Sequence, residues 1–428
     1  MQQSIRRSTR HDVEVEQHAG YIELIRRNVN FRRLWLGNIV SLLGDWFNTI
    51  ALYTLVFELT GSPFALGAVF ISKMLPWALA SPIAGLVVDR FDRRHLMIVS
   101  DLLRAVVVLG FLLIDDPAHV YLIYVLITLQ VVIGSVFQPA KSASVPNITT
   151  PAELLTANAL SSATWSVMLA AGAALGGFAT AWLGVDMVFI IDSATYVVSA
   201  WFIYRTVIPQ EKATPSEEGL VRSAFRDIAE GWRHIRSEPR IARIATAKAT
   251  WGIAGGSLVY LLTLLGEEIS PGATAMGIGI LFAVRGAGTG IGPIVVRAVF
   301  LDRATWPAIL GLAIAFSGVC YAVVGFMPWT YVVTVMILLA HAASGANWVL
   351  ATVMLQKRTP DRFRGRVFAT EWLLVMGAES LSIFLASSAL EAGLIDLRTI
   401  FIVMGAVQFL TGLLWFAVVV PRERREEG

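Results

Sequence analysis

Apolar residues fall in long runs along this chain, and short segments rich in charge, glycine or proline separate the runs. The runs lie near residues 33–58, 63–88, 95–114, 119–139, 155–182 and 186–204, and then near 242–265, 273–296, 306–326, 329–353, 367–390 and 398–420. A helix needs about 20 apolar residues to cross a bilayer. Periodicity does not separate such helices from buried ones, but length and number do. The pattern predicts an all-α integral membrane protein with twelve transmembrane helices.

The longest polar stretch, residues 205–240, divides the runs into six and six. Features of the two groups recur at a similar offset, as Pro151 and Pro360 do after the fourth and tenth runs. Such an internal duplication is typical of transporters with two moving halves. We therefore expect two pseudo-symmetric six-helix halves. The expected segments are a cytoplasmic N-terminal segment 1–30, a first half 31–204, a linker 205–240, a second half 241–420 and a cytoplasmic tail 421–428.

The linker has two parts of different character. Its first part contains Pro209, Pro215 and acidic residues and is typical of a flexible connection. In the second part Phe225, Ile228 and Trp232, with Val221 and Ile235 on either side, recur at helical spacing among charged residues. This pattern predicts an amphipathic helix on the inner membrane surface. A regulatory site there is the alternative to a plain interfacial linker.

Composition agrees with a membrane protein. Of the residues 56% are hydrophobic and 15% charged, and the mean hydropathy is +0.66. Soluble domains have about 45–50% apolar and about 25% charged residues. The single cysteine, Cys320, excludes an internal disulfide or a cysteine metal cluster, and residues 1–30 contain no signal-peptide core. A soluble enzyme, a disordered chain and a disulfide scaffold are all disfavoured.

The basic residues indicate the orientation. All but five of the 34 Lys and Arg residues fall in the terminal segments, in loops after even-numbered spans, or at the adjoining helix ends. The five exceptions are Lys73, Arg104, Lys248, Arg285 and Arg398. By the positive-inside rule both termini are cytoplasmic. The sequence pI of about 9.1 then reflects anchoring to anionic lipid rather than binding to nucleic acid.

The loop after the second span carries a motif. It reads Gly85-Leu-Val-Val-Asp89-Arg90-Phe-Asp92-Arg93-Arg94. This resembles the G-x-x-x-D-R-x-G-R-R signature of the major facilitator superfamily, in the place where that family has it, although an aspartate stands at the usual second glycine. The resemblance implies the major facilitator fold and a cytoplasmic gate motif that latches the two halves. A basic anchoring loop without a latch is the alternative.

Other stretches resemble the drug:proton antiporter branch that contains macrolide-efflux and enterobactin-exporter proteins. They are "GDWFNTIAL", "SDLLRA", "PAKSASVPNITTPAELLTANAL", "IDSATYVVSA" and "LQKRTPDRFRGRVF". The resemblance covers residues 27–420 and implies export of a small amphiphilic substrate in exchange for protons across a bacterial inner membrane. Two departures weaken the inference of proton antiport. Gln130 stands where many drug antiporters have arginine, and the span-five motif lacks its proline near Gly176.

Ionisable residues inside spans tend to line a cavity or to pair, because burying them in a bilayer costs about 2.5–3.5 kcal/mol each on insertion scales. Asp45 and Glu379 each lie about 13 residues into a span, near mid-depth. Asp45 is the leading candidate for proton coupling and Glu379 the second. Arg285 could neutralise either acid or attract an anionic substrate. His341 titrates in the useful range, although a structural hydrogen bond is its ordinary role.

Asp101 and Arg104 are spaced i, i+3 and are expected to pair on one face of the third span. Toward the inner end of that span, the pair is expected to be structural or part of the gate. Glu371 is nearer the inner surface and is expected to join Asp89 and Arg90. The gate motif then comprises Gly85, Asp89, Arg90, Arg93, Arg94, Asp101, Arg104 and Glu371.

The sequence therefore predicts a secondary transporter that works by alternating access and exports a drug, macrolide or siderophore-like molecule. Its expected partners are the substrate, protons and membrane lipids, and the expected state is a monomer. No motif for ATP, a metal or another cofactor is present, and no nucleophile–base pair indicates an enzyme. A lysophospholipid flippase of the same fold is the first alternative. A membrane sensor or assembly factor that transports nothing is the second.

Overall fold

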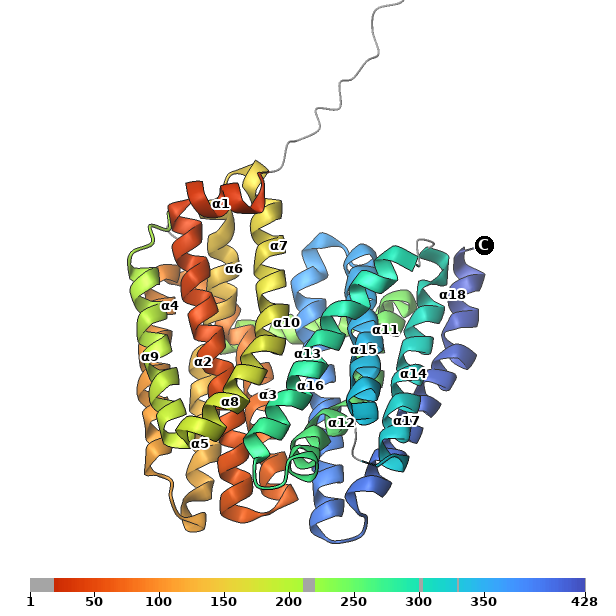
Figure 1. The fold of residues 1–428 in the computed structure, drawn as a ribbon. Helices are drawn as coiled ribbons and strands as arrows, with labels where there is room; N and C mark the ends of the chain where they lie inside the picture. The colour runs from red at the N-terminus through yellow and green to blue at the C-terminus, as the bar shows by residue number, and fades with distance from the viewer. Residues whose placement is uncertain (1–18, 211–219, 300–302, 329–330, 428) are drawn as a thin grey trace, which may run out of the picture.

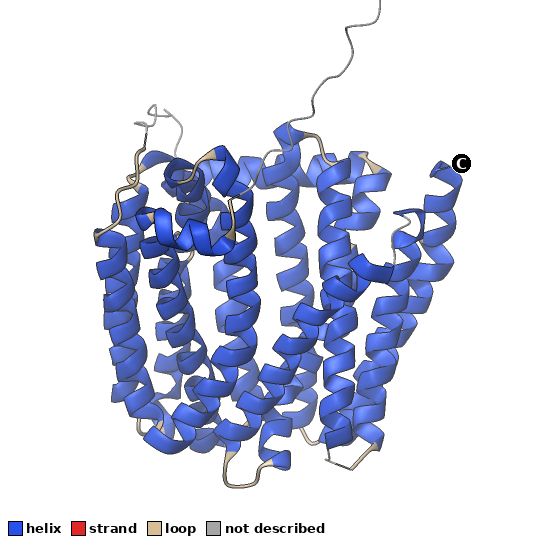
Figure 2. Ribbon diagram, turned by 45° about the horizontal axis from the view of Figure 1, so that its top comes forward, coloured by secondary structure: helices blue, strands red, loops and turns tan. Residues whose placement is uncertain are grey.

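A computed structural model describes residues 19–210, 220–299, 303–328 and 331–427. Within these ranges the chain is almost entirely helical and contains no strand (Figure 2). Among the described residues, 12 helical segments are long and apolar enough to cross a membrane. The prediction of an all-α protein with twelve spans is confirmed. The outer parts of the predicted terminal segments and part of the linker lie outside the described residues.

The first six spans form the N-terminal half, which lies on the left of Figure 1. A short helix α1 (Tyr21–Arg27) precedes them. The spans are α2 (Val29–Thr60); α3 (Pro63–Arg90); α4 (Arg93–Leu109) with the 3-10 turn η1 (Gly110–Leu113); η2 (Pro117–His119) with α5 (Val120–Gly134) and α6 (Phe137–Ile148); α7 (Pro151–Val167) with the π-helical turn η3 (Met168–Gly172) and α8 (Ala173–Leu183); and α9 (Val185–Tyr204).

The last six spans form the C-terminal half, on the right of Figure 1. The linker helix α10 (Leu220–Ser237) precedes them. The spans are α11 (Pro239–Ala245) with α12 (Ala247–Ile269); α13 (Thr274–Val299); α14 (Trp306–Phe326), preceded by η4 (Arg303–Thr305); α15 (Tyr331–Arg358); α16 (Asp361–Glu391); and α17 (Leu397–Val418) with α18 (Val420–Glu427).

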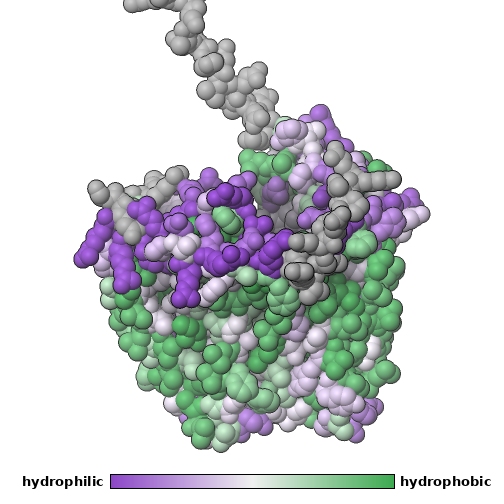
Figure 3. All heavy atoms as spheres, turned by 180° about the vertical axis from the view of Figure 1, so that it is seen from behind, coloured by the Kyte–Doolittle hydropathy of each residue, from purple (hydrophilic) through white to green (hydrophobic). Residues whose placement is uncertain are grey.

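One face of the bundle carries both α1 and the C-terminal end of α18, and we call it the terminal face (Figure 1). Hydrophilic residues gather on this face, whereas hydrophobic residues cover the sides (Figure 3). Exposed leucine, valine and tryptophan side chains on the spans, such as Trp182 and Val106, belong to those sides. An apolar belt below a charged face is what a membrane-embedded bundle requires.

Polar residues cap the N-terminal ends of several helices. Ser62 accepts a hydrogen bond from the Ala65 amide at the start of α3, directly before Pro63. Thr150 and Glu153 form a capping box at the start of α7. Such caps satisfy amides that have no partner within the helix. Helix α3 thus begins where its apolar run begins, whereas α7 begins four residues before the run near 155–182.

The amphipathic helix predicted in the linker is present as α10, which packs against the first turns of α16. Arg366 of α16 forms salt bridges to Asp227 (3.0 Å) and Glu230 (2.8 Å) of α10. Gly231 allows this approach, because a Cβ there would lie within 2.7 Å of the Arg366 carbonyl carbon. The helix is thus fastened to the C-terminal half, and it also contacts α3.

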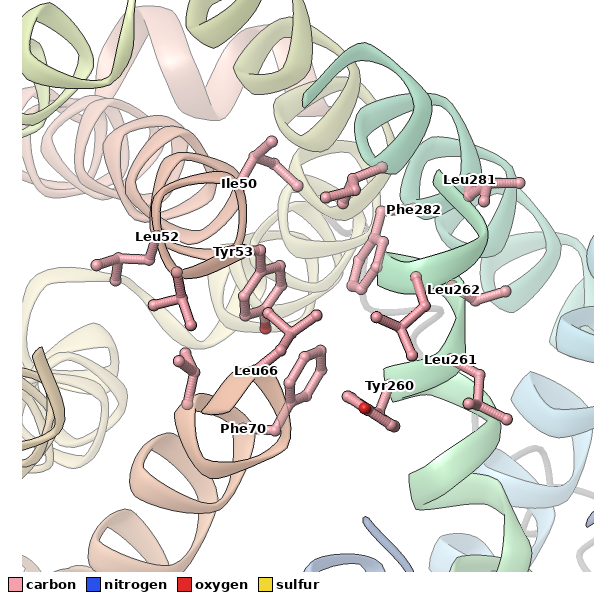
Figure 4. Close-up of a cluster of buried hydrophobic side chains, with 14 of the residues drawn as sticks. Ile50, Leu52, Tyr53, Leu66, Phe70, Tyr260, Leu261, Leu262, Leu281 and Phe282 are labelled. Carbon is pink, nitrogen blue, oxygen red and sulfur yellow. The ribbon is translucent and has the colours of Figure 1, made fainter. Parts of the chain in front are cut away.

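The two halves meet along α3 and α16 and along α8 and α13. A Cβ on Gly177 of α8 would lie 2.9 Å from the Cα of Gly279 in α13, so the two backbones nearly touch. Near the face opposite the termini, the Tyr260 hydroxyl donates to the Pro63 carbonyl at 2.7 Å. Figure 4 shows Tyr53, Phe70, Tyr260 and Phe282 meeting there between the halves. The halves are closed against each other on that side.

Candidate functional site

A cavity of about 220 Å³ opens within the N-terminal half. Most of the residues that line it are polar or charged, although it lies among membrane spans. The lining residues are Asn38, Ser41, Leu42, Asp45, Asn48, Thr49, Lys73, Trp77, Arg104, Gln130, Val131, Gly134, Phe137, Gln138 and Tyr196. Polar groups at membrane depth are retained where they bind or conduct something. This cavity is therefore the candidate functional site.

Helix α2 supplies the largest share of the wall. Asn38, Ser41, Asp45 and Asn48 follow one another at spacings of three and four, which places them on one helical face. At Gly44 the helix meets α9 so closely that a Cβ would lie 3.0 Å from the Thr195 Cβ. This close approach brings polar residues of α9 to the turn of α2 that carries Asp45.

Asp45 accepts a short hydrogen bond from the Tyr196 hydroxyl of α9. The same hydroxyl accepts from Gln130 Nε2 of α5 at 3.1 Å. Tyr196 is fully buried, whereas the Asp45 side chain is 37% exposed and faces the cavity. Asp45 is thus both held by a buried donor and accessible to a ligand.

Arg104 of α4 joins the acids of this site. It forms a close salt bridge to Asp101 one turn earlier, as the i, i+3 spacing predicts. Its other terminal nitrogen lies 3.7 Å from Asp45 Oδ1. The guanidinium also stacks over the rings of Tyr196 (4.3 Å) and Phe137 (5.1 Å). The Asp101–Arg104 pair therefore belongs to the Asp45 network rather than standing apart from it.

Asp192 of α9 is a third carboxylate beside this network, and it is fully buried. It accepts a hydrogen bond from Asn48 Nδ2 at 2.7 Å and another from the Thr195 hydroxyl at 3.3 Å. Asn48 Oδ1 has no hydrogen-bond partner among the residues that the structure describes. Two carboxylates thus contact Arg104, and a third is linked to the cavity wall through Asn48.

Lys73 of α3 lies on the opposite side of the same cavity wall. Its ammonium group donates to the Thr49 hydroxyl at 2.6 Å and lies 5.9 Å from the Tyr53 ring centre. Within the described part of the chain, no carboxylate lies within 4.0 Å of it. Lys73 is therefore a half-buried cation that has a hydroxyl but no anion as its partner.

The predicted candidates of the C-terminal half do not line this cavity. His341 Nε2 shares a 2.6 Å hydrogen bond with the Tyr321 hydroxyl, which is the ordinary role weighed for it. Glu379 is buried against Gly252 and Gly256 of α12. Arg285 is half-buried, with its guanidinium 5.5 Å from the Phe282 ring. The arginine that lies beside Asp45 is Arg104.

Glu371 forms a 3.0 Å salt bridge with Lys248 of α12, and both side chains are at most 3% exposed. The Lys248 ammonium also lies 4.8 Å from the Trp348 ring. The structure thus gives Glu371 a partner inside the C-terminal half. Its predicted grouping with Asp89 and Arg90 stays a prediction.

The motif after α3 makes contacts within the N-terminal half. Arg93 donates to the Ala143 carbonyl at 2.8 Å, and Arg94 donates to the Tyr204 carbonyl. A Cβ on Gly85 would meet no atom within 4 Å, so the close helix approach expected there is not present. The role of Gly85, Asp89 and Arg90 as a latch stays a prediction.

Asp92, which replaces the glycine of the motif, caps α4 through the His95 amide at 2.7 Å. Partial burial alone would raise the pKa of Asp92. Hydrogen bonds from the His95 backbone and ring, with nearby positive charge, instead hold its pKa below the usual range. The substitution therefore supplies a helix cap without removing the basic residues around it.

Sequence reasoning did not assign Tyr196, Gln130 or Asn48 to the site and gave Asp192 no role. Two spacings in the sequence could have indicated these residues. Asp192 and Tyr196 are four residues apart and so share a face of α9. The polar residues of α2 recur at spacings of three and four, which also places them on one face. Among the described residues, no group of three or more His, Cys, Asp or Glu could hold a metal ion.

Comparisons with known proteins agree with this architecture. The chain is 26% identical over 415 residues to the uncharacterized MFS-type transporter YfiS of Bacillus subtilis (strain 168). The aligned region covers 91% of this chain and 93% of YfiS. It is 25% identical over 342 residues to the putative bacilysin exporter BacE of Bacillus subtilis, covering 79% and 84%.

The crystal structure of the nucleoside transporter NupG has the same fold. It superposes with a TM-score of 0.71 at 12% identity and covers 90% of this chain and 98% of that one. The family model of the Major Facilitator Superfamily matches residues 34–371. By its twelve spans and this match, the chain belongs to the Major Facilitator Superfamily.

Proposed function

We propose that this transporter exports a hydrophobic or amphiphilic small molecule by alternating access, in exchange for protons. The observation that carries the proposal is the cavity in the N-terminal half, where Asp45 faces the space and is linked to Tyr196 and Arg104. A carboxylate that is accessible from a cavity can take up either a proton or a positively charged ligand group. Competition between the two is the simplest basis for antiport.

The surroundings of Asp45 suit this exchange. The charged and titratable groups near it are Asp101 and Arg104 of α4, Asp192 and Tyr196 of α9, and Lys73 of α3. The three carboxylates outnumber the two cations, Arg104 and Lys73. An uncompensated charge in a low-dielectric site is costly, so a proton on one carboxylate is favoured when no cation is bound. Departure of that proton leaves a negative site ready for substrate.

We place both termini in the cytoplasm of a bacterium, with the protein in its inner membrane. The concentration of basic residues in the terminal segments, in the loops after even-numbered spans and at the adjoining helix ends supports this orientation through the positive-inside rule. The halves contact each other on the face opposite the termini through Tyr260 and Pro63. In this orientation, the molecule is closed toward the outside. The binding of Asp89, Arg90 and their neighbours as a cytoplasmic latch would belong to the opposite state.

A lipid flippase is less favoured by the site. Its cavity of about 220 Å³ lies inside one half, whereas a lipid with acyl chains requires a longer, continuous apolar groove. A sensor or assembly factor without transport would have no need for charged groups around a cavity at membrane depth.

The test uses everted membrane vesicles that contain the full-length protein. Uptake of a cationic dye is measured with and without an imposed proton gradient, for the wild type and for Asp45→Asn. We expect uptake driven by the gradient in the wild type and its loss in the variant. Equal gradient dependence in both proteins would remove Asp45 from coupling. Dye uptake that ignores the gradient in the wild type would contradict proton antiport.

A further inference from the structure

The cavity in the N-terminal half has a size and a charge pattern that together restrict its ligand. Its volume is about 220 Å³, whereas pockets for drug-sized ligands have about 300–1,000 Å³. A bulky drug or macrolide does not fit inside it as it stands. The ligand that fits this space is a small molecule or the small charged end of a larger one.

The charges on the wall are of both signs, and Asp45 and Lys73 form no salt bridge with each other, although Arg104 lies 3.7 Å from Asp45 Oδ1. Asp45 presents a side chain that is 37% exposed toward the cavity. Lys73, on another helix, has the Thr49 hydroxyl as its partner, and among the described residues it makes no salt bridge within 4.0 Å. Arg104 is already engaged by Asp101. The cavity thus offers one accessible anion and one accessible cation.

The wall between these two charges is built from groups that form hydrogen bonds. Thr49 lies one helical turn after Asp45; its hydroxyl accepts from the Lys73 ammonium and donates to the main-chain carbonyl of Asp45 at 2.6 Å. Asn48 is 2% exposed, and its Oδ1 has no hydrogen-bond partner in the described ranges although the residue lines the cavity. A buried acceptor of this kind is costly unless a ligand donor meets it. Trp77 adds a flat apolar surface.

We infer that this cavity binds a small zwitterion of the amino-acid or dipeptide class, with its ammonium group at Asp45 and its carboxylate at Lys73. The Asn48 oxygen receives a second N–H of the ligand, and Trp77 contacts its apolar part. This inference rests on the proposed function and specifies its substrate. It also accounts for exchange with protons, because the ligand ammonium and a proton compete for Asp45.

The test measures binding to the purified full-length protein in lipid nanodiscs. The probes are a panel of free amino acids and dipeptides, each compared with its N-acetyl and its C-amide derivative. Binding is followed by the ligand-induced shift of the thermal unfolding midpoint. Loss of one charge-assisted hydrogen bond corresponds to about a ten- to hundredfold change in affinity. We expect the best zwitterion to bind at least tenfold more tightly than either derivative.

Two variants assign the ends of the ligand. Lys73→Gln should bind the C-amide as well as the parent zwitterion, and Asp45→Asn should bind the N-acetyl derivative as well as the parent. Lys141→Gln is the matched control, since Lys141 donates to Asn38 Oδ1 at 2.9 Å but does not line the cavity. Lys141→Gln should still bind the parent zwitterion more tightly than either derivative, as the wild type does. If Lys73→Gln lowers stability and leaves the preference for the carboxylate unchanged, the inference is wrong.

Transport in vesicles distinguishes this inference from the proposed function. Gradient-driven movement of a cationic dye, with no zwitterion of the panel preferred over its derivatives, would overturn the inference and leave the proposed function standing. Preferred binding of a zwitterion that the protein does not move along any gradient would support the inference and contradict the proposed function. Proton-driven movement of the preferred zwitterion, abolished in Asp45→Asn, would support both.

Discussion

The two halves of this transporter share a helix arrangement but treat their buried charges differently. In the N-terminal half, Asp45, Tyr196 and Arg104 form a connected network beside a cavity. In the C-terminal half, Lys248 and Glu371 form a pair that is nearly inaccessible. Charge that faces a cavity can exchange partners, whereas charge sealed between packed helices cannot. Of these two clusters, only the one in the N-terminal half is accessible from a cavity, and the proposed binding site is therefore placed there.

The largest effect is expected at the sealed pair of the C-terminal half. Lys248→Met alone leaves Glu371 buried without its cation, which should lower the free energy of unfolding by about 3–5 kcal/mol. The double variant Lys248→Met, Glu371→Leu removes both charges and should recover most of this loss. Thermal unfolding in detergent checks both variants. Loss of transport in a stable double variant would show that the Lys248–Glu371 pair is functional. The contrast between an accessible, functional cluster in the N-terminal half and a purely structural pair in the C-terminal half would then be wrong.

The next effect concerns the two mid-depth acids. Asp45→Asn should reduce proton-driven transport on the order of a hundredfold, the lower end of what a positioned proton-transfer group contributes. Glu379 is buried against α12 and does not face the cavity. Glu379→Gln should therefore change the rate of proton-driven transport less than tenfold. Initial rates in everted vesicles at equal protein levels provide the measurement. The reverse order would move the coupling site to the C-terminal half.

A pair of tyrosines sharpens the comparison further. Tyr196→Phe removes the hydroxyl that donates to Asp45, and we expect transport to fall about tenfold, as for loss of a hydrogen bond to a charged group. Tyr321→Phe removes the hydroxyl beside His341 and serves as the control in the other half. Its transport should remain within about twofold of the wild type, since that hydrogen bond joins two neutral groups away from the cavity. Equal losses would argue against a special role for Tyr196.

The smallest effect is expected at the end of α4. Asp92→Ala removes the cap and should lower stability by about 1 kcal/mol at neutral pH. Because the folded pKa of Asp92 lies below the usual value, its contribution is present above about pH 4 and is lost as the pH falls further. Thermal unfolding of the wild type and of Asp92→Ala is measured at pH 7 and below pH 4. The difference in stability between the two proteins should be smaller at the lower pH. A constant difference would assign the effect to helix propensity instead.

Much of the fold could be predicted because length and hydropathy decide it locally. Twelve runs of sufficient length become twelve spans, and the spacing of Phe225, Ile228 and Trp232 becomes α10. Asp101 and Arg104 meet because three residues in a helix bring side chains onto one face. Each of these inferences requires only neighbours within a few turns.

The candidate site could be predicted only in part. Asp45 was identifiable by its depth, but its hydrogen-bond donor Tyr196 is 151 residues away. The rotation of each helix about its own axis decides which residues face each other. In helices that are apolar on all sides, the hydropathy pattern does not indicate this rotation. The π-helical turn at Met168–Gly172 could not be predicted from the sequence either. The only sign of unusual structure in this span was the missing proline of the span-five motif near Gly176. Contacts between distant spans require the three-dimensional structure.

The near-contact of Gly177 and Gly279 has a mechanical consequence. Backbone meets backbone there, and a Cβ on Gly177 would lie 2.6 Å from the Ala275 carbonyl oxygen. A larger residue at either position would therefore push α8 away from α13 and separate the halves on the closed side. The distance of closest approach between the two halves at this contact is thus set by the absence of two side chains.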